Sequence, residues 1–207
     1  MSGGRKNMKQ KFLNYSINLI KEKNDFNEIK LAELKYGLEA FYMLCTKLIV
    51  IMLIALVLGL FNELMLFMLF YTPLRGLGFG FHANNSLECW LISVPVFIII
   101  PFLAKTLVLS PIIIQIVIIT STIIFLFFAP ADTKKKPLIN TKKRLINKTL
   151  IVLISLGYLL ATLLVDNSLL INSLMFACSW QSICVNPLLY KLFHQPFNNY
   201  KTYLNEV

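Results

Sequence analysis

His82 and Cys89 are the pair of side chains in this sequence whose types and spacing could support covalent chemistry. A thiol becomes a strong nucleophile when a neighbouring imidazole takes its proton or stabilises its thiolate. On a straight helix, seven residues would put both groups on one face but about 10.5 Å apart along the axis. Contact between them therefore needs a bend or an unwound segment. The alternative interpretation is a histidine at an interface and a cysteine packed in a helix.

The residues around this pair favour an unwound segment. Three glycines alternate with larger residues between positions 75 and 81, a pattern that disfavours regular helix. We expect His82 on this irregular segment and Cys89 in the first turn of the next helix, with Ser86 as a candidate N-cap. A helix N-terminus carries roughly half a positive charge and stabilises a thiolate or an oxyanion. Glu88 could orient the imidazole only by folding back, so we expect a dyad.

Arg75 follows a short apolar stretch and has two interpretations. Its guanidinium could bind a substrate carboxylate through two parallel hydrogen bonds. It could equally anchor the chain to lipid phosphate. Cys184 and His194 form a second pair of the same residue types, but Pro187 lies between them and we expect them to be unlinked. The four cysteines include no CxxC pair, which argues against a zinc site.

The composition places the chain in the membrane class. Hydrophobic residues make up 57% and charged residues 14%, with a mean hydropathy of +0.69. Soluble domains carry about 25% charged residues. The net charge of +10 comes mainly from the N-terminal region and from residues 134–148. Basic segments between apolar runs are typical of cytoplasmic loops that face anionic lipid, so we do not expect nucleic-acid binding.

The apolar runs predict an all-α polytopic membrane protein, residues 1–207 forming a single domain. About six helices are expected, with a short second helix that leads into the glycine-rich segment. The predicted spans are residues 36–61, 64–74, 87–103, 107–128, 150–165 and 168–185. Residues 1–30 predict an amphipathic helix that lies on the membrane surface or packs on the protein's own loops. Placing this segment and the basic loop 129–148 in the cytoplasm puts both termini and the catalytic segment there as well.

Several of these residues together resemble the accessory gene regulator B family of membrane peptidases. They are Arg75, Gly80, His82-Ala83, Cys89, the basic stretch APADTKKKPL at 129–138 and KLIV at 47–50. The resemblance covers essentially the whole chain, and the two longer motifs are specific in combination. Phe79 and Phe81 depart from the pattern, because many members carry smaller residues around the glycine. This departure could reshape the substrate groove.

The resemblance implies a cysteine endopeptidase of bacterial quorum sensing. Its substrate would be a precursor peptide with an amphipathic leader, a signal core and an acidic C-terminal tail. Cys89 would attack the peptide bond before the tail, with His82 as general base, and would hold the core as a thioester. A cysteine or serine of the peptide would then close a thiolactone or lactone ring, without a cofactor or metal. The resemblance also allows a homodimer.

Basic and small residues near the dyad are the predicted substrate-binding set. They are Arg75, Gly80, Ser86, Lys134, Lys135 and Lys136. The lysines could attract an acidic tail or hold anionic lipid. Two other functions stay open. A small transporter or exporter of a signal peptide would need ionisable groups on several spans, whereas residues 107–128 and 150–165 offer little beyond Gln115. A non-catalytic membrane partner of a sensor would not need Cys89.

Overall fold

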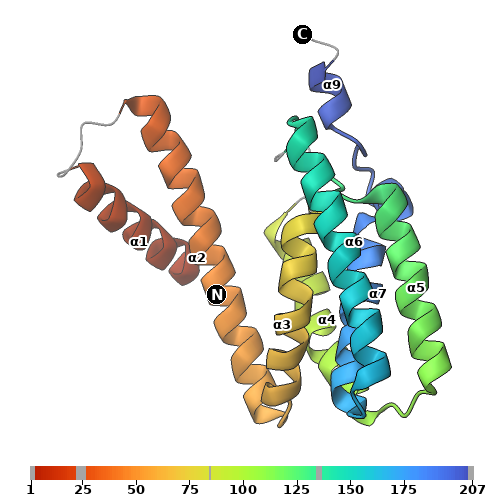
Figure 1. Cartoon of the computed structure of the whole chain (residues 1–207). Helices are drawn as coiled ribbons and strands as arrows, with labels where there is room; N and C mark the ends of the chain where they lie inside the picture. Colours follow the sequence, from red (N-terminus) through yellow and green to blue (C-terminus); the bar gives the residue numbers. More distant parts are fainter. Residues whose placement is uncertain (1–2, 22–26, 84, 134–136, 205–207) are drawn as a thin grey trace. The chain divides into compact units, whose positions relative to one another are not determined.

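The computed structural model describes residues 3–21, 27–83, 85–133 and 137–204, and these residues form nine α-helices (Figure 1). Five helices are long and apolar enough to cross a membrane. They are α2 (Glu28–Val57), α4 (Ser86–Thr106), α5 (Pro111–Phe128), α6 (Thr141–Leu164) and α7 (Ser168–Val185). The predicted all-α polytopic membrane fold is therefore confirmed.

The chain divides into two compact units, Met1–Ile54 and Ala55–Val207. The first unit contains α1 (Gly3–Lys21) and most of α2. The aromatic rings of Phe12 and Tyr42 lie 5.3 Å apart within it. The predicted N-terminal helix is thus present, although it ends before residue 30. Its position on the membrane surface stays a prediction, as does the single domain.

The buried helix of the second unit is α7. It packs against α3 (Phe61–Gly78), α4, α5, α6 and the short α8 (Pro187–Leu192). Over an 18-residue window 56% of α7 is buried, against at most 28% for the other candidate spans of this unit. Helix α7 therefore provides the common surface on which the others are arranged. The last short helix is α9 (Tyr200–Leu204).

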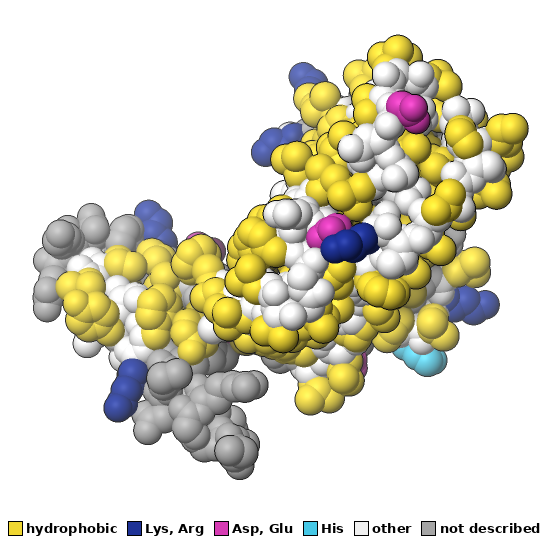
Figure 2. All heavy atoms as spheres, turned by 90° about the horizontal axis from the view of Figure 1, so that it is seen from below, with side chains coloured by type: hydrophobic (Ala, Val, Ile, Leu, Met, Phe, Trp, Pro, Cys, Tyr) yellow, Lys and Arg dark blue, Asp and Glu magenta, His cyan; other side chains and the backbone are white. Residues whose placement is uncertain are grey.

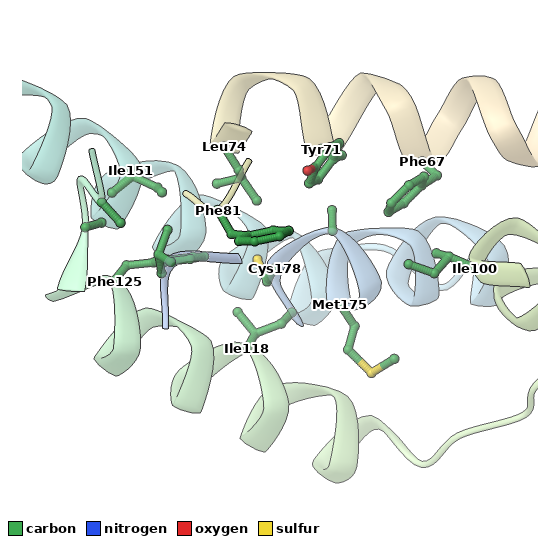
Figure 3. Close-up of a cluster of buried hydrophobic side chains, with 14 of the residues drawn as sticks. Phe67, Tyr71, Leu74, Phe81, Ile100, Ile118, Phe125, Ile151, Met175 and Cys178 are labelled. Atoms are coloured by element: carbon green, nitrogen blue, oxygen red, sulfur yellow. The ribbon is translucent and has the colours of Figure 1, made fainter. Parts of the chain in front are cut away.

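A cluster of buried side chains joins α3 to its neighbours (Figure 3). The ring of Phe67 stacks 5.4 Å from Tyr71, and both rings form T-shaped pairs with Phe97 on α4. Cys178 on α7 is fully buried in the same cluster. Lipid chains are as apolar as this core, so close packing rather than exclusion from water has to hold the helices together.

The outer surface of the second unit is also apolar. Val108, Phe127 and Leu164 are among many large hydrophobic side chains that are mostly exposed. In the view of Figure 2, hydrophobic atoms make up much of the described surface and charged groups are scattered among them. Such a surface suits contact with lipid.

Several helices differ in extent from the sequence prediction: α2 begins at Glu28 instead of residue 36, and two of the other differences bear on the site. Helix α3 does not stop at residue 74 but continues through Pro73 and Gly76 to Gly78, which gives it 18 residues and a length of about 27 Å. At Gly78 a Cβ would lie 2.6 Å from Gln181 Nε2 and 2.7 Å from Ile151 Cδ1. This glycine therefore permits close helix packing rather than unwinding. Tertiary contact here overrides the low helix propensity of glycine.

Helix α6 is the second difference. It begins at Thr141, inside the basic stretch that was predicted as a loop up to residue 148. The side chain of Asn140 accepts a hydrogen bond from the Lys143 amide and caps the helix. This cap satisfies one of the free N–H groups of the first turn. The basic residues 142–148 therefore lie on the helix and not in a loop.

Candidate active site

The segment between α3 and α4, described at residues 79–83 and 85, is irregular and begins with two unusual backbone conformations. Phe79 has φ 54° and Gly80 has φ 103°. A Cβ on Gly80 would lie 2.7 Å from the carbonyl oxygen of Cys184 and 2.8 Å from Arg75 Nη1. Only glycine fits both this conformation and this space. Gly80 was predicted to bind substrate, and the structure gives it a backbone role.

Polar side chains hold the carbonyl groups of this segment in place. Arg75 donates from Nη1 to the Phe79 carbonyl at 2.6 Å and from Nη2 to the Phe81 carbonyl at 2.7 Å. The buried Gln181 of α7 donates from Nε2 to the same Phe79 carbonyl at 3.1 Å. Charge-assisted hydrogen bonds of this kind are stronger than neutral ones. Arg75 therefore fixes the backbone that leads to His82.

Backbone hydrogen bonds tie the same segment to two distant parts of the chain. Gly80 donates to the Ala131 carbonyl at 2.8 Å, and Ala131 donates to the Gly78 carbonyl at 2.9 Å. These bonds form an isolated parallel bridge between Phe79 and Ala131. Phe81 donates to the Cys184 carbonyl at 2.7 Å, at the end of α7. The segment thus lies between the α5–α6 connection and the end of α7 and is hydrogen-bonded to both.

His82 lies on this segment, as predicted, and its side chain is exposed. Its carbonyl accepts a hydrogen bond of 2.6 Å from Gln195 Nε2. The preceding side chain, Phe81, is buried and lies 4.5 Å from the ring of Phe193. The histidine therefore follows a buried anchor and faces the surface.

Cys89 is the fourth residue of α4 and lies in its first turn, also as predicted. The N-cap is Asn85, so the prediction that Ser86 caps this helix is wrong. Asn85 accepts from the Glu88 amide at 2.8 Å, and its Nδ2 donates to Glu88 Oε1 at 2.8 Å. The sulfur of Cys89 lies 4.0 Å from Ser93 Oγ. The half-buried thiol is within reach of the helix dipole.

Asp132 is a buried residue of this region that the sequence analysis did not single out. Its side chain is fully buried. Oδ2 accepts from the amides of Tyr200 at 2.8 Å and Leu138 at 3.3 Å, and Oδ1 lies 3.6 Å from Arg144 Nη1. The Arg144 guanidinium lies 3.5 Å from the centre of the Tyr200 ring. An acidic residue alone in a basic stretch was the signal that could have identified it.

The remaining predicted site residues are only partly described. Lys134, Lys135 and Lys136 lie outside the described residues. Substrate binding by Arg75, Gly80 and Ser86 stays a prediction. Cys184 is buried at the end of α7, and His194 is exposed on the C-terminal side of α8.

Comparison with known proteins places the chain in a family. The sequence profile of the family described as Accessory gene regulator B matches residues 12–185. The chain belongs to this family. An AgrB-like protein of Listeria monocytogenes serotype 4a is 36% identical over 177 residues, with 83% of this chain and 84% of the relative covered. The sequence resemblance is confirmed, and with it the assignment to an accessory gene regulator system of quorum sensing.

More distant relatives of this accessory gene regulator B family member cover a similar share. An AgrB-like protein of Clostridium acetobutylicum is 27% identical over 172 residues, covering 83% of this chain and 82% of the relative. The accessory gene regulator protein B of Staphylococcus epidermidis is 26% identical over 172 residues, covering 83% and 87%. No solved structure matches the chain. The match to the family profile ends with α7, so residues 186–207 lie beyond it.

Proposed function

We propose that this chain is a membrane cysteine endopeptidase that removes the C-terminal tail of a quorum-sensing precursor peptide and cyclises the core. The observation that carries the proposal is the placement of two residues around one helix start. Cys89 lies in the first turn of α4, and His82 lies three residues before the N-cap on a backbone fixed by hydrogen bonds. Family membership supports the same substrate class.

The first half of the reaction is acylation. His82 takes the proton of the Cys89 thiol, and the thiolate attacks the carbonyl carbon of the peptide bond before the tail. The N-terminus of α4 stabilises the negative charge that develops on the oxygen. The imidazolium then gives its proton to the departing amine. The tail leaves, and the core stays bound to Cys89 as a thioester.

The second half of the reaction is cyclisation. His82 takes the proton of a cysteine or serine side chain within the bound peptide, and that sulfur or oxygen attacks the thioester carbonyl. The bond to Cys89 breaks, and the thiolate recovers its proton. The ring bond replaces the thioester bond, so no nucleotide is needed. Exclusion of water by surrounding lipid and protein favours cyclisation over hydrolysis.

The charged residues near the site fit a substrate with an acidic tail. Lys142 and Lys143 are exposed at the start of α6 and continue the basic stretch 134–136. Their field would attract an acidic peptide or anionic lipid. Arg75 uses two of its five donors on backbone carbonyls, so its main contribution in this proposal is to shape the site. The proposed orientation has both termini and the site in the cytoplasm. The proposal is compatible with a homodimer.

Mass spectrometry of a co-expressed precursor peptide tests the proposal. We expect the intact enzyme to release the acidic tail, and we expect Cys89→Ser or His82→Ala to lower the rate more than about 1000-fold. The chain offers a matched control in Cys45→Ser, at another half-buried cysteine. This control should keep full cleavage. Normal cleavage by Cys89→Ser or by His82→Ala would contradict the proposal.

A further inference from the structure

We infer that the C-terminal segment, defined as residues 193–200, positions the imidazole of His82, with Gln195 as the residue that makes the contact. This inference rests on the proposed function, because it concerns the residue that would act as general base. The segment follows the range matched by the family profile.

The contact itself is a hydrogen bond from Gln195 Nε2 to the carbonyl of His82 at 2.6 Å. Gln195 is placed for this bond by its own backbone, since its amide donates to the Tyr190 carbonyl at 2.8 Å. The Tyr190 hydroxyl in turn donates to the Ala131 carbonyl at 3.0 Å. Burial raises the pKa of Tyr190, so the phenol keeps its proton and stays a donor. Gln195 is thus connected to the fixed backbone around Gly80.

Aromatic packing adds a second attachment at the preceding residue. The Phe81 ring lies 4.5 Å from the ring of Phe193 and 6.3 Å from the ring of Tyr190. Tyr190 also packs edge-on against Phe197 at 5.2 Å. The C-terminal segment therefore contacts the side chain of one residue and the carbonyl of the next. Together these contacts restrain the backbone angles that set the direction of the imidazole.

The far end of the C-terminal segment is anchored independently. Asn199 donates from Nδ2 to the carbonyls of Asp132 and Pro196, and the Tyr200 amide donates to the Asp132 carboxylate. Arg144 completes this anchor, since it lies near the carboxylate and over the Tyr200 ring. Hydrogen bonds to a buried carboxylate are expensive to break. The segment is therefore held at both ends and presents Gln195 between them.

His82 is held from two sides by this arrangement. Before it, the Phe81 amide donates to the Cys184 carbonyl; after it, the carbonyl of His82 accepts from Gln195. Loss of the second bond would let the peptide group rotate and swing the imidazole relative to Cys89. A misplacement of about 1 Å can reduce a rate by about 100-fold. We expect a smaller loss here, about tenfold, because the first bond remains.

The test uses two readouts on the full-length protein in lipid vesicles. One is the rate of tail release from a precursor peptide, resolved into kcat and KM. The other is the rate at which iodoacetamide alkylates Cys89, followed peptide by peptide so that the other cysteines do not interfere. Gln195→Met removes the donor, and we expect kcat and the alkylation rate at pH 7 to fall about tenfold with KM unchanged. Gln195→Lys restores a donor and should recover most of both rates.

The control is Gln115→Met, the same exchange on α5, which should change neither rate. If Gln195→Met does not fold, Gln195→Asn retains the amide but withdraws it by one methylene group and should show the same losses. Unchanged rates in a folded Gln195→Met or Gln195→Asn would overturn the inference. The proposed function fails in a different way, through unimpaired cleavage by His82→Ala or Cys89→Ser.

Discussion

The two ends of the second unit are held together in different ways. At the site end, residues 79–83, 129–133 and 193–199 lie outside the long helices and exchange hydrogen bonds; the helix ends that carry them are visible in Figure 1. Side chains from distant parts of the chain bind backbone carbonyls there, as Gln181, Tyr190 and Gln195 do. At the opposite end the connections at 58–60, 107–110 and 165–167 are only three or four residues long.

The far end has fewer polar contacts, and they serve the ends of helices. Lys105 pairs with Glu63 at 2.9 Å and donates to the Gly59 carbonyl at 3.1 Å. Asn172 donates to the carbonyls of Ala104 and Leu107, which satisfies the C-terminus of α4. Gly59 at this end also has a positive φ, 65°, but nothing lies within 4 Å of a Cβ added there, unlike at Gly80. Polar side chains at the site end therefore fix an irregular backbone segment, whereas those at the far end satisfy the carbonyl groups at helix ends.

This difference predicts that changes at the site end lower both activity and stability, whereas changes at the far end lower stability alone. The largest effect is expected for Asp132→Ala. Removing the fully buried carboxylate leaves the half-buried Arg144 without its acidic partner and the Tyr200 and Leu138 amides without their acceptor, which costs about 3–5 kcal/mol of unfolding free energy. Thermal and denaturant unfolding in detergent would measure the loss, and tail release should fall with it. Asp166→Ala at the exposed far end is the control and should stay within about 0.5 kcal/mol of the parent.

The next largest effect is expected for Gly80→Ala. The methyl group would meet the Cys184 carbonyl and Arg75 in a backbone conformation that alanine disfavours, so we expect a loss of about 1–3 kcal/mol and a sharp fall in tail release. The same unfolding and cleavage assays apply. Gly76→Ala is the control, because nothing lies within 4 Å of its added methyl and alanine is the better helix former. Equal behaviour of the two variants would contradict a backbone role for Gly80.

A smaller effect is expected for Tyr190→Phe. This change removes one hydrogen bond to the Ala131 carbonyl, which costs about 1 kcal/mol of unfolding free energy. Because burial raises the pKa of Tyr190, the parent should also lose stability at strongly alkaline pH, as the unfolded phenol ionises first. The difference in unfolding free energy between the parent and Tyr190→Phe should therefore become smaller at strongly alkaline pH. Tyr36→Phe, at an exposed tyrosine, should show neither change.

The smallest effect is expected for Lys105→Met at the far end. The lysine side chain is 48% exposed, so the ion pair with Glu63 contributes at most about 1 kcal/mol. Thermal and denaturant unfolding should show a small loss of unfolding free energy, and the rate of tail release by the folded protein should be unchanged. A loss of cleavage out of proportion to the loss of stability would show that the two ends are coupled. It would contradict the expectation that changes at the far end lower stability alone.

The features that sequence predicted were those with local signals. Apolar runs located the helices, and the glycine-rich stretch before a capped helix start placed His82 and Cys89 correctly in their elements. The cap was assigned to Ser86 instead of Asn85, since neighbouring polar residues are equally good caps by type. The start of α6 was missed because its basic first turns lack apolar periodicity, although Asn140 is a strong capping signal.

The features that sequence did not predict depend on distant partners. Asp132 and Tyr200 lie 68 residues apart, and neither belongs to a periodic pattern. The length of α3 depends on Gln181 and Ile151, which pack where the side chain of Gly78 would be. The local patterns of a single sequence do not show which distant residues contact one another. For that reason the sequence placed His82 and Cys89 in their elements but did not predict the contacts that hold the backbone between them.

The distance along the chain between the site and its supports has a consequence for synthesis. Gln181 and Gln195 follow the carbonyls they bind by 102 and 113 residues. A ribosome needs on the order of ten seconds to make that much chain. During this interval Cys89 has been made, but two of the side chains that hold the backbone before it have not. Under the proposed function, the thiol would gain its positioned general base only after Gln195 is made, and early acylation of other peptides would be avoided.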